Sequence, residues 1–445
     1  MVSHRGGGGG ATTTSKAHRL VFILPIIIIF GLLSWVFTSH VVSTPKSSTK
    51  IGSSFVVGVE VYGTTLEKNH SQIINGTRHY TNLERLEGRL RRARVAIKLG
   101  NRSQDSDYIP HGPMYWNANA FHRSYIEMEK QFKVFVYGEG ELPLFHNGPC
   151  KSIYSMEGNF IHELEVNKQF RTLDPDKAHV YFLPFSVTML VKYVYVPNSH
   201  DFGPIKQTVR DYANLISTKY PFWNRGLAAD HFMVACHDWG PEVSKSNDYL
   251  GRNSIRVLCN ANTSEGFNPS KDVSFPEINL PNGNTHGLIG GPSPRVRTVL
   301  AFFAGGLHGP IRPLLLELWE NKDQDMMVHQ YLPKGVDYYK MMRKSKFCLC
   351  PSGFEVANHY VAPFGDALNW KSFSVEVSVN DIPNLKRILM SISTSHYLRM
   401  QRRLIQVRKH FEFNSPPKRF DVFHMILHSI WLRRLNVRVH DGLPT

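Results

Sequence analysis

The residues best suited to chemistry lie in the stretch from Arg297 to Glu355. An apolar run, Val299–Ala304, breaks at Gly305-Gly306, and Arg312 follows at the start of a helix-like run. A strand that ends in a glycine turn and leads into a helix presents backbone N–H groups to phosphate in open α/β sheets. An arginine just past that turn can hold a diphosphate through its planar fork. The spacing predicts a phosphate site, although a buried strand that only needs glycines to turn would show the same pattern.

A second candidate for chemistry is Asp238, which follows His237 directly after the apolar run His231–Cys236. Side chains just past the carboxyl end of a strand tend to face the ligand in α/β sheets. Asp238 would act as a general base if an acceptor hydroxyl lay within hydrogen-bond reach. The alternative is structural: Asp238 caps the next element and His237 is packed.

Three further patterns resemble metal sites. Asp174–Asp176 and Asp323–Asp325 both read D-x-D, which could hold a metal bound to a diphosphate. His424 and His428 are four apart on a predicted helix, but Met425 stands where a zinc protease would carry glutamate. We interpret all three as structural and expect no metal and no cofactor.

The elements that must position these residues alternate between short apolar strands and helical stretches, which predicts an α/β fold with a largely parallel sheet. A linker rich in glycine and proline, Gly287–Pro294, divides them into two sets. The predicted strands are Phe132–Tyr137, His179–Phe185, His231–Cys236 and Ile255–Cys259 in the first set, and Val299–Ala304, Phe347–Cys350 and Phe373–Val379 in the second. Helices are expected at 205–217, 385–392, 395–411 and 420–434.

The N-terminal region predicts a membrane anchor. Leu20–Phe37 contains 18 residues without charge. As a helix it would be roughly 27 Å long, close to the thickness of a hydrocarbon core. More basic residues precede it than follow it closely, which favours a cytosolic N-terminus. Four sequons follow the anchor, as expected for a lumenal glycoprotein, with their acceptors at Asn69, Asn75, Asn101 and Asn262.

We therefore expect five segments. Residues 1–19 form a cytosolic tail, 20–37 the anchor and 38–120 a stem. Residues 121–293 and 294–445 form two α/β domains. The stem carries an amphipathic helix with its apolar stripe at Leu83, Leu86, Leu90, Ala93 and Ile97. It could form a short coiled coil that links homo- or hetero-oligomers, or it could pack on its own domain.

The net charge of +16 is scattered along the chain, and the predicted lumenal location argues against nucleic acid. The charge instead favours other anionic partners, such as sugar nucleotides, acidic polysaccharide or a membrane surface. The five cysteines leave at least one free. Cys236 and Cys259 end two predicted strands and form the candidate disulfide. Cys348 and Cys350 are expected to lie in the core.

From about His122 onward the chain resembles the plant exostosin-like glycosyltransferases, family 47. The matching stretches are Phe132–Gly138, Gly148–Tyr154, Asp174–Ser186, Trp223–Arg225, Asp230–Phe232, His237–Pro241, Leu258–Asn262, Ala301–Arg312, Lys346–Val356 and Pro363–Leu389. The resemblance implies a GT-B type fold with two Rossmann-like domains and a cleft between them. It also implies a single-pass type II Golgi membrane protein without a bound metal. Such an enzyme transfers a sugar from a nucleotide-sugar donor to a cell-wall polysaccharide or a glycoprotein glycan.

The resemblance also assigns roles to residues. Its donor-binding positions correspond to Gly305, Gly306, His308, Arg312, Ser352, Gly353 and Glu355. Asp238 stays a candidate base on the acceptor side. In an inverting reaction the base deprotonates the acceptor hydroxyl as it attacks the anomeric carbon, while arginine and helix-end N–H groups stabilise the departing diphosphate.

One departure concerns the donor site. In relatives, a helix that carries a glutamate and a strand follow the position of Ala357, whereas here Ala357 runs straight into Asn358. About twenty residues are absent, the size of a βα crossover. A gene-model error, a splice form or a true loss would each give this sequence. The alternative hypothesis is therefore a non-catalytic homologue that acts as a scaffold or partner subunit. A metal-dependent GT-A enzyme would instead lose activity with a chelator.

Overall fold

The computed structural model describes residues 81–100, 108–351 and 360–439. The predicted anchor and the sequons at Asn69, Asn75 and Asn101 lie outside these ranges. Among the described residues, no helix has the length and apolar character needed to cross a bilayer.

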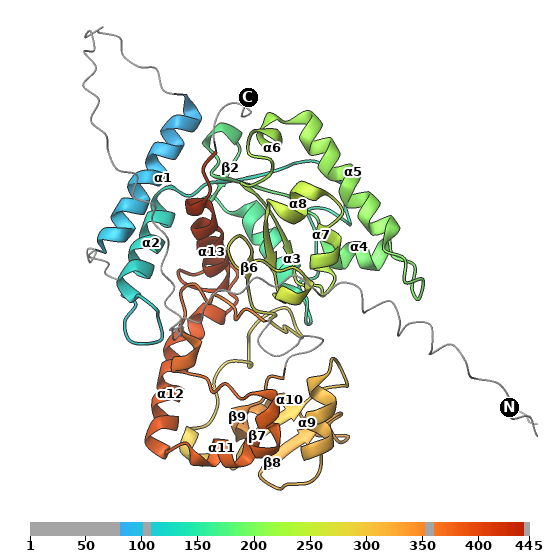
Figure 1. Cartoon of the computed structure of the whole chain (residues 1–445), viewed down its shortest axis with the longest axis vertical. Coiled ribbons are helices and arrows are strands. Elements are labelled where there is room, and N and C mark those ends of the chain that lie inside the picture. Colours follow the sequence, from blue (N-terminus) through green and yellow to red (C-terminus); the bar gives the residue numbers. More distant parts are fainter. Residues whose placement is uncertain (1–80, 101–107, 352–359, 440–445) are drawn as a thin grey trace, which may run out of the picture. The chain divides into compact units, whose positions relative to one another are not determined.

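The first sheet has six strands, all paired in parallel, in the order β2-β1-β3-β4-β5-β6 (Figure 1). The strands of a parallel sheet are buried on both faces and read as continuous apolar runs. β3, β4 and β5 fit this rule, since every residue in them is buried. The bounds are β1 Val134–Val136, β2 Arg171–Thr172, β3 Val180–Phe182, β4 His231–Ala235, β5 Ile255–Leu258 and β6 Val273–Ser274. The four strands predicted for this half are confirmed, with shorter ends.

Helices cover both faces of this sheet. Alternate residues of a strand point to opposite faces, so Phe232 and Val234 contact one core, and Met233 and Ala235 contact another. Figure 1 shows α1, α2 and α13 on one side of the sheet and α5 to α8 on the other. The bounds are α2 Ala118–Gln131, α3 Ser155–Val166, α4 Val187–Tyr193, α5 Gly203–Lys219, α6 Pro221–Arg225, α7 Gly240–Ser244, α8 Asp248–Arg252 and α13 Val422–Asn436.

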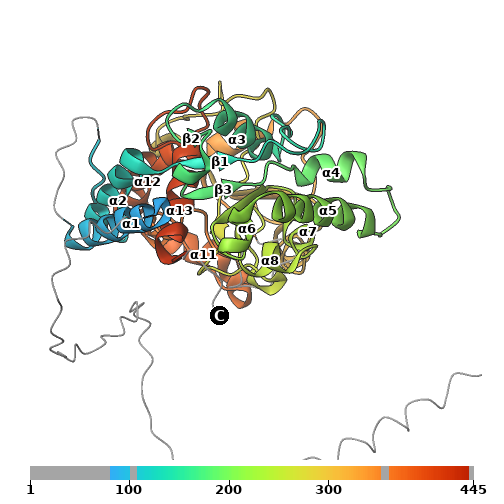
Figure 2. The same ribbon diagram turned by 90° about the horizontal axis from the view of Figure 1, so that it is seen from above.

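The stem helix, α1 (Asn82–Leu99), packs on its own domain. Thr81 and Glu84 form a capping box at its start, and Gly100 ends it with a left-handed φ of 60°. Leu86 and Leu90 are buried in the same core as α2, and α1, α2 and α13 lie side by side in Figure 2. The apolar stripe that could have formed a coiled coil is thus covered within the chain.

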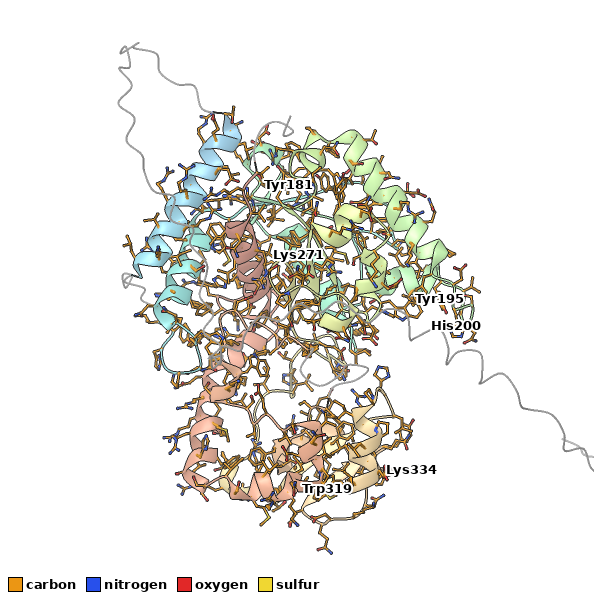
Figure 3. All side chains as sticks on the ribbon, viewed as in Figure 1. Tyr181, Tyr195, His200, Lys271, Trp319 and Lys334 are labelled. Carbon is orange, nitrogen blue, oxygen red and sulfur yellow. A yellow bond between two sulfur atoms is a disulfide. The ribbon has the colours of Figure 1, made fainter. Side chains whose placement is uncertain are left out.

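The second sheet is smaller and also parallel, with the order β8-β7-β9. Its core includes Ala301, Leu315 and Leu385. Trp319, labelled in Figure 3, donates from Nε1 to the carbonyl oxygen of Ile382 at 2.9 Å and joins two helical segments over this sheet. The bounds are β7 Val299–Ala304, β8 Met326–His329, β9 Ser345–Cys348, α9 Ile311–Trp319, α10 Tyr338–Lys344, α11 Leu385–Ser391 and α12 Thr394–Val407.

The predicted strand Phe373–Val379 is wrong. A 3-10 helix ends at Ser372, an irregular segment follows, and a second 3-10 helix begins at Val379. An alternating sequence becomes a strand only where a neighbour pairs with it. Here Phe373 enters the core of the first sheet, whereas Val377 packs against the core of the second. The segment passes between two cores and does not lie along a sheet.

The predicted domain limits also need correction. The sequence pattern places residues 294–445 in one domain, but α13, Phe364 and Leu368 belong to the core of the first sheet. α13 is buried around nearly its whole circumference, with its two histidines and two arginines included, so the first domain surrounds it. Cys348, the last residue of the edge strand β9, and Cys350, just after it, are exposed, so the expectation that both lie in the core is wrong. The predicted disulfide Cys236–Cys259 is present.

Candidate active site

Three polar side chains follow neighbouring strands of the first sheet. Asp238 comes after β4, Asn260 after β5 and Glu277 after β6, and these strands are consecutive in the sheet. The carboxyl ends of parallel strands meet at one edge, which is where α/β proteins bind ligands. Of the three, the sequence predicted only Asp238. Glu277 was missed because β6 has only two residues, and only the short alternating stretch before it, Val273–Phe275, signals a strand.

Asp238 is exposed at this edge, and neighbouring groups shift the pKa of its carboxyl. Desolvation by the surrounding protein raises the pKa of its carboxyl, and the nearby His308 and Arg312 partly offset that rise. His308 and Arg312 follow β7 of the second sheet. Asp238 therefore lies within electrostatic range of the predicted phosphate loop, as a base next to a donor site must.

Glu277 faces the same arginine. Desolvation by the surrounding protein raises the pKa of Glu277 to about 7, the charge of Asp238 adds to the rise, and Arg312 opposes it. The Glu277 carboxylate makes no hydrogen bond or ion pair within the part of the chain that the structure describes. A reachable carboxylate that gains or loses its proton near neutral pH is suited to general base catalysis.

His237 is excluded as the base. Its Nδ1 accepts a hydrogen bond from the backbone N–H of Trp239 at 3.1 Å, so the neutral ring carries its proton on Nε2. Burial lowers the pKa of His237 to about 4, and its ring lies 4.8 Å from that of Tyr154. His237 is therefore a packed ring that accepts a backbone hydrogen bond. Among the described residues no side chain caps α7, so Asp238 does not have the capping role that was the alternative.

Glu157 holds the loop that carries His237 and Asp238. Its fully buried carboxylate accepts the backbone N–H groups of Cys236 at 2.9 Å and His237 at 3.4 Å. It also accepts from Ser186 Oγ at 2.5 Å and from the N–H of Thr188 at 2.8 Å, at the start of α4. One carboxylate thus fixes the ends of β3 and β4 relative to each other. The Cys236–Cys259 disulfide joins the ends of β4 and β5 in the same way.

The predicted phosphate loop follows β7. Gly305 donates to the carbonyl oxygen of His329, and a Cβ at Gly305 would lie 3.0 Å from the ring of Phe303. Arg312, in the first turn of α9, donates from Nη1 to the carbonyl oxygen of Gly306 at 3.5 Å. Its Nε is buried and has no partner among the described residues. A buried N–H without a partner is costly and points to a group that the ligand supplies.

The other predicted donor residues divide into two groups. Gly306 and His308 lie in the loop with Arg312, and Pro310 at the N-cap of α9 provides no side-chain cap, so the first N–H groups of the helix stay available. Ser352, Gly353 and Glu355 lie outside the described residues. Within the described ranges, no group of three or more metal-ligating side chains could hold an ion.

The D-x-D carboxylates serve the fold. Asp323 and Asp325 pair with Lys386 at 2.7 and 2.8 Å, and Asp174 caps a short 3-10 helix. The glycan predicted at Asn262 stays a prediction, and in the folded chain the acceptor amide is covered. This residue is 1% exposed, and its side chain bonds to Glu265 and caps another 3-10 helix. An acceptor amide needs a surface position.

Comparison with known proteins decides the family. Residues 128–359, just over half of the chain, match the Exostosin GT47 domain. The chain belongs to the exostosin GT47 family. It is 63% identical over 382 residues to the "Probable glycosyltransferase At5g03795" of Arabidopsis thaliana, across 81% of this chain and 74% of that protein. It is therefore a glycosyltransferase by class, and that class takes a nucleotide-sugar donor and a glycan acceptor.

More distant relatives name particular sugars. The "Probable glucuronosyltransferase Os01g0926700" of Oryza sativa subsp. japonica is 27% identical over 346 residues, across 67% of this chain and 81% of that protein. The "Probable beta-1,4-xylosyltransferase IRX10" of Arabidopsis thaliana is 26% identical over 347 residues, across 67% of this chain and 82% of that protein.

Proposed function

We propose that this GT47 member transfers a sugar from a nucleotide-sugar donor to a cell-wall polysaccharide or a glycoprotein glycan. The names of its relatives, which include a glucuronosyl- and a xylosyltransferase, support the transfer of a sugar of that kind. We also propose a GT-B arrangement of the two parallel sheets and a Golgi location through the single anchor Leu20–Phe37, with the two-sheet region in the lumen.

The observation that carries the proposal is that Asp238 and Glu277 both follow strands at the carboxyl edge of one sheet, with Arg312 close enough to lower the pKa of each. A diphosphate held by Arg312 and the start of α9 would place the anomeric carbon of the donor beside two carboxylates. Positive groups already positioned where negative charge develops on the leaving group usually contribute more to such catalysis than any other single effect.

The proposed step needs only groups of this chain and its substrates. An acceptor hydroxyl gives its proton to a carboxylate, and its oxygen bonds to the anomeric carbon. The bond from that carbon to the diphosphate oxygen breaks, and the electron pair leaves with the diphosphate. We assign the proton to Glu277, because its raised pKa makes it the stronger base. Asp238, the base predicted from sequence, supplies the neighbouring charge that raises it. No metal takes part in the proposal.

Incubation of the purified full chain with single nucleotide sugars and glycan acceptors tests this function, with detection of the elongated glycan. Arg312→Ala should lower the rate about 100-fold or more, the scale for removal of one leaving-group stabiliser. Arg399→Ala is the matched control, because Arg399 is exposed on α12 and makes no ion pair among the described residues. Equal rates for wild type and Arg312→Ala would refute the donor role.

One observation favours a second function, that of a non-catalytic partner subunit. The first relative aligns over 382 residues, yet 81% of the 445 residues here is only about 360. About twenty aligned positions thus have no residue in this chain, the size of the gap that the sequence places after Ala357. A folded chain that associates with a catalytic relative but binds no nucleotide sugar would support this function and exclude transfer.

A further inference from the structure

A groove on the first sheet's outer helical layer has no role in the proposed transfer. Its volume is about 780 Å³, and it lies among α5, the segment after α7, and α8. Neither Asp238 nor Glu277 lines it. α7, which begins two residues after Asp238 and spans five residues, leads from the candidate active site to the groove.

One wall of the groove carries a buried hydroxyl without a partner. Ser246 is 5% exposed, and its Oγ makes no hydrogen bond within the described part of the chain. Buried hydroxyls are nearly always paired, because an unpaired one loses its hydration without compensation. Ser246 therefore points to a polar ligand group that completes it.

The groove lining carries more positive than negative charge, with Arg210, Lys245 and Arg252 against the single carboxylate of Asp248. Arg252 is exposed and makes no hydrogen bond or ion pair among the described residues. Arg210 donates from Nε to the carbonyl oxygen of Ser246 at 3.1 Å, which fixes its guanidinium at the rim. Lys245 pairs with Glu242, outside the lining. Arginine forks match carboxylates in shape as well as charge.

The remaining lining suits a sugar ring. Tyr249 is 42% exposed and pairs with no other aromatic ring in the described ranges, so one face of the ring is open. The exposed side-chain amide of Asn214 can donate to one hydroxyl and accept from another. An aromatic face with a few placed polar groups is typical of a binding site for a partly apolar ligand.

We propose that this groove binds a stretch of acidic glycan whose uronate carboxylates pair with Arg252 and Arg210. The aromatic face of Tyr249 takes a sugar ring, and Ser246 bonds to a hydroxyl of the ligand. The inference rests on the proposed function only in taking glycan as the ligand class, and the groove is separate from the site of transfer.

Titration of the full chain with trigalacturonate, its neutral methyl ester and inorganic sulfate tests the proposal. Trigalacturonate should bind, and the ester should bind at least about tenfold more weakly, because a charge-assisted bond is lost. Arg252→Ala should weaken binding about fivefold to tenfold, with Arg399→Ala as the matched control. Equal binding of acid and ester, or sulfate that competes at the same concentration as trigalacturonate, would overturn the assignment to a glycan.

Ser246→Ala gives the sharper test. Because Oγ has no partner among the described residues, its removal should leave the melting temperature unchanged or raise it, while trigalacturonate binding falls. A lower melting temperature with unchanged binding would show that Ser246 is structural and would overturn its role. Arg312→Ala should bind trigalacturonate like wild type, so a failure of transfer with intact binding would count against the proposed function alone.

Discussion

The proton acceptor makes the most detailed prediction. If Glu277 must be ionised, the rate of sugar transfer follows its titration. With a pKa of about 7, half of the chains carry the carboxylate at pH 7. The ionised fraction then falls about tenfold for each pH unit, to about one hundredth at pH 5. A glutamate at its ordinary pKa of 4.5 would still be mostly ionised at pH 5.

Removal of a neighbouring charge should shift the acidic limb of the pH profile in a direction that can be measured. The charge of Asp238 raises the pKa of Glu277, so Asp238→Asn should move the acidic limb of the pH profile to lower pH. The charge of Arg312 lowers it, so any activity left in Arg312→Gln should show the limb at higher pH. Single-turnover rates from pH 5 to 9 measure both shifts, because they isolate the chemical step from product release.

Removal of the base completes the test. Glu277→Gln should lower the single-turnover rate about 10²- to 10⁴-fold and abolish the acidic limb. Glu376→Gln is the control, since Glu376 is exposed and pairs only with Lys371 in the described structure. A Glu277→Gln enzyme that keeps both its rate and its acidic limb would refute the assignment of the base.

Three further predictions concern stability. Glu157→Gln should lower the free energy of unfolding in urea by about 2–4 kcal/mol. The wild-type carboxylate offers an oxygen to each backbone N–H donor, whereas the NH₂ group of the glutamine would have to face one of those donors. An unchanged urea midpoint would contradict the buried network. Replacement of Cys236 and Cys259 by serine should cost about 3.5 kcal/mol, from the chain entropy of a 23-residue separation, and reduction of the wild type should give the same loss. Burial lowers the pKa of His410 and of His428 to about 3. The unfolded chain then binds more protons below its own pKa of 6.5, so these two histidines alone should lower stability by about 2 kcal/mol from pH 6.5 to 5.5, and the lowered pKa values of His179 and His237 add to the fall. A flat profile in urea titrations would contradict this.

The elements that could be predicted from sequence are those with local information. Val299–Ala304 matches β7 at both ends, because six apolar residues lead directly to a glycine pair. The helix predicted at 205–217 appears as Gly203–Lys219, since its apolar residues recur at helical spacing. β4, His231–Ala235, was also predicted from its short apolar run, and this prediction placed Asp238 just after the end of a strand.

The elements that failed depend on distant partners. Phe373–Val379 alternates like a strand but has no neighbour to pair with among the described residues, and two cores share its side chains. α13 follows the second sheet in sequence and packs on the first, which no local pattern reveals. Glu277 was missed for a related reason: its importance comes from Asp238 and Arg312, each 35 or more residues away in sequence.

The central claim is that the Arg312 loop and the Glu277 edge form one site that transfers sugar. The most direct measurement is the elongated glycan formed by the purified full chain with a panel of nucleotide sugars, for wild type, Arg312→Ala, Glu277→Gln and Arg399→Ala. The claim predicts product from at least one donor with wild type and Arg399→Ala, and a loss of about 100-fold or more in the other two variants. A folded wild-type chain that forms no product with any donor, or variants that match wild type, would contradict it.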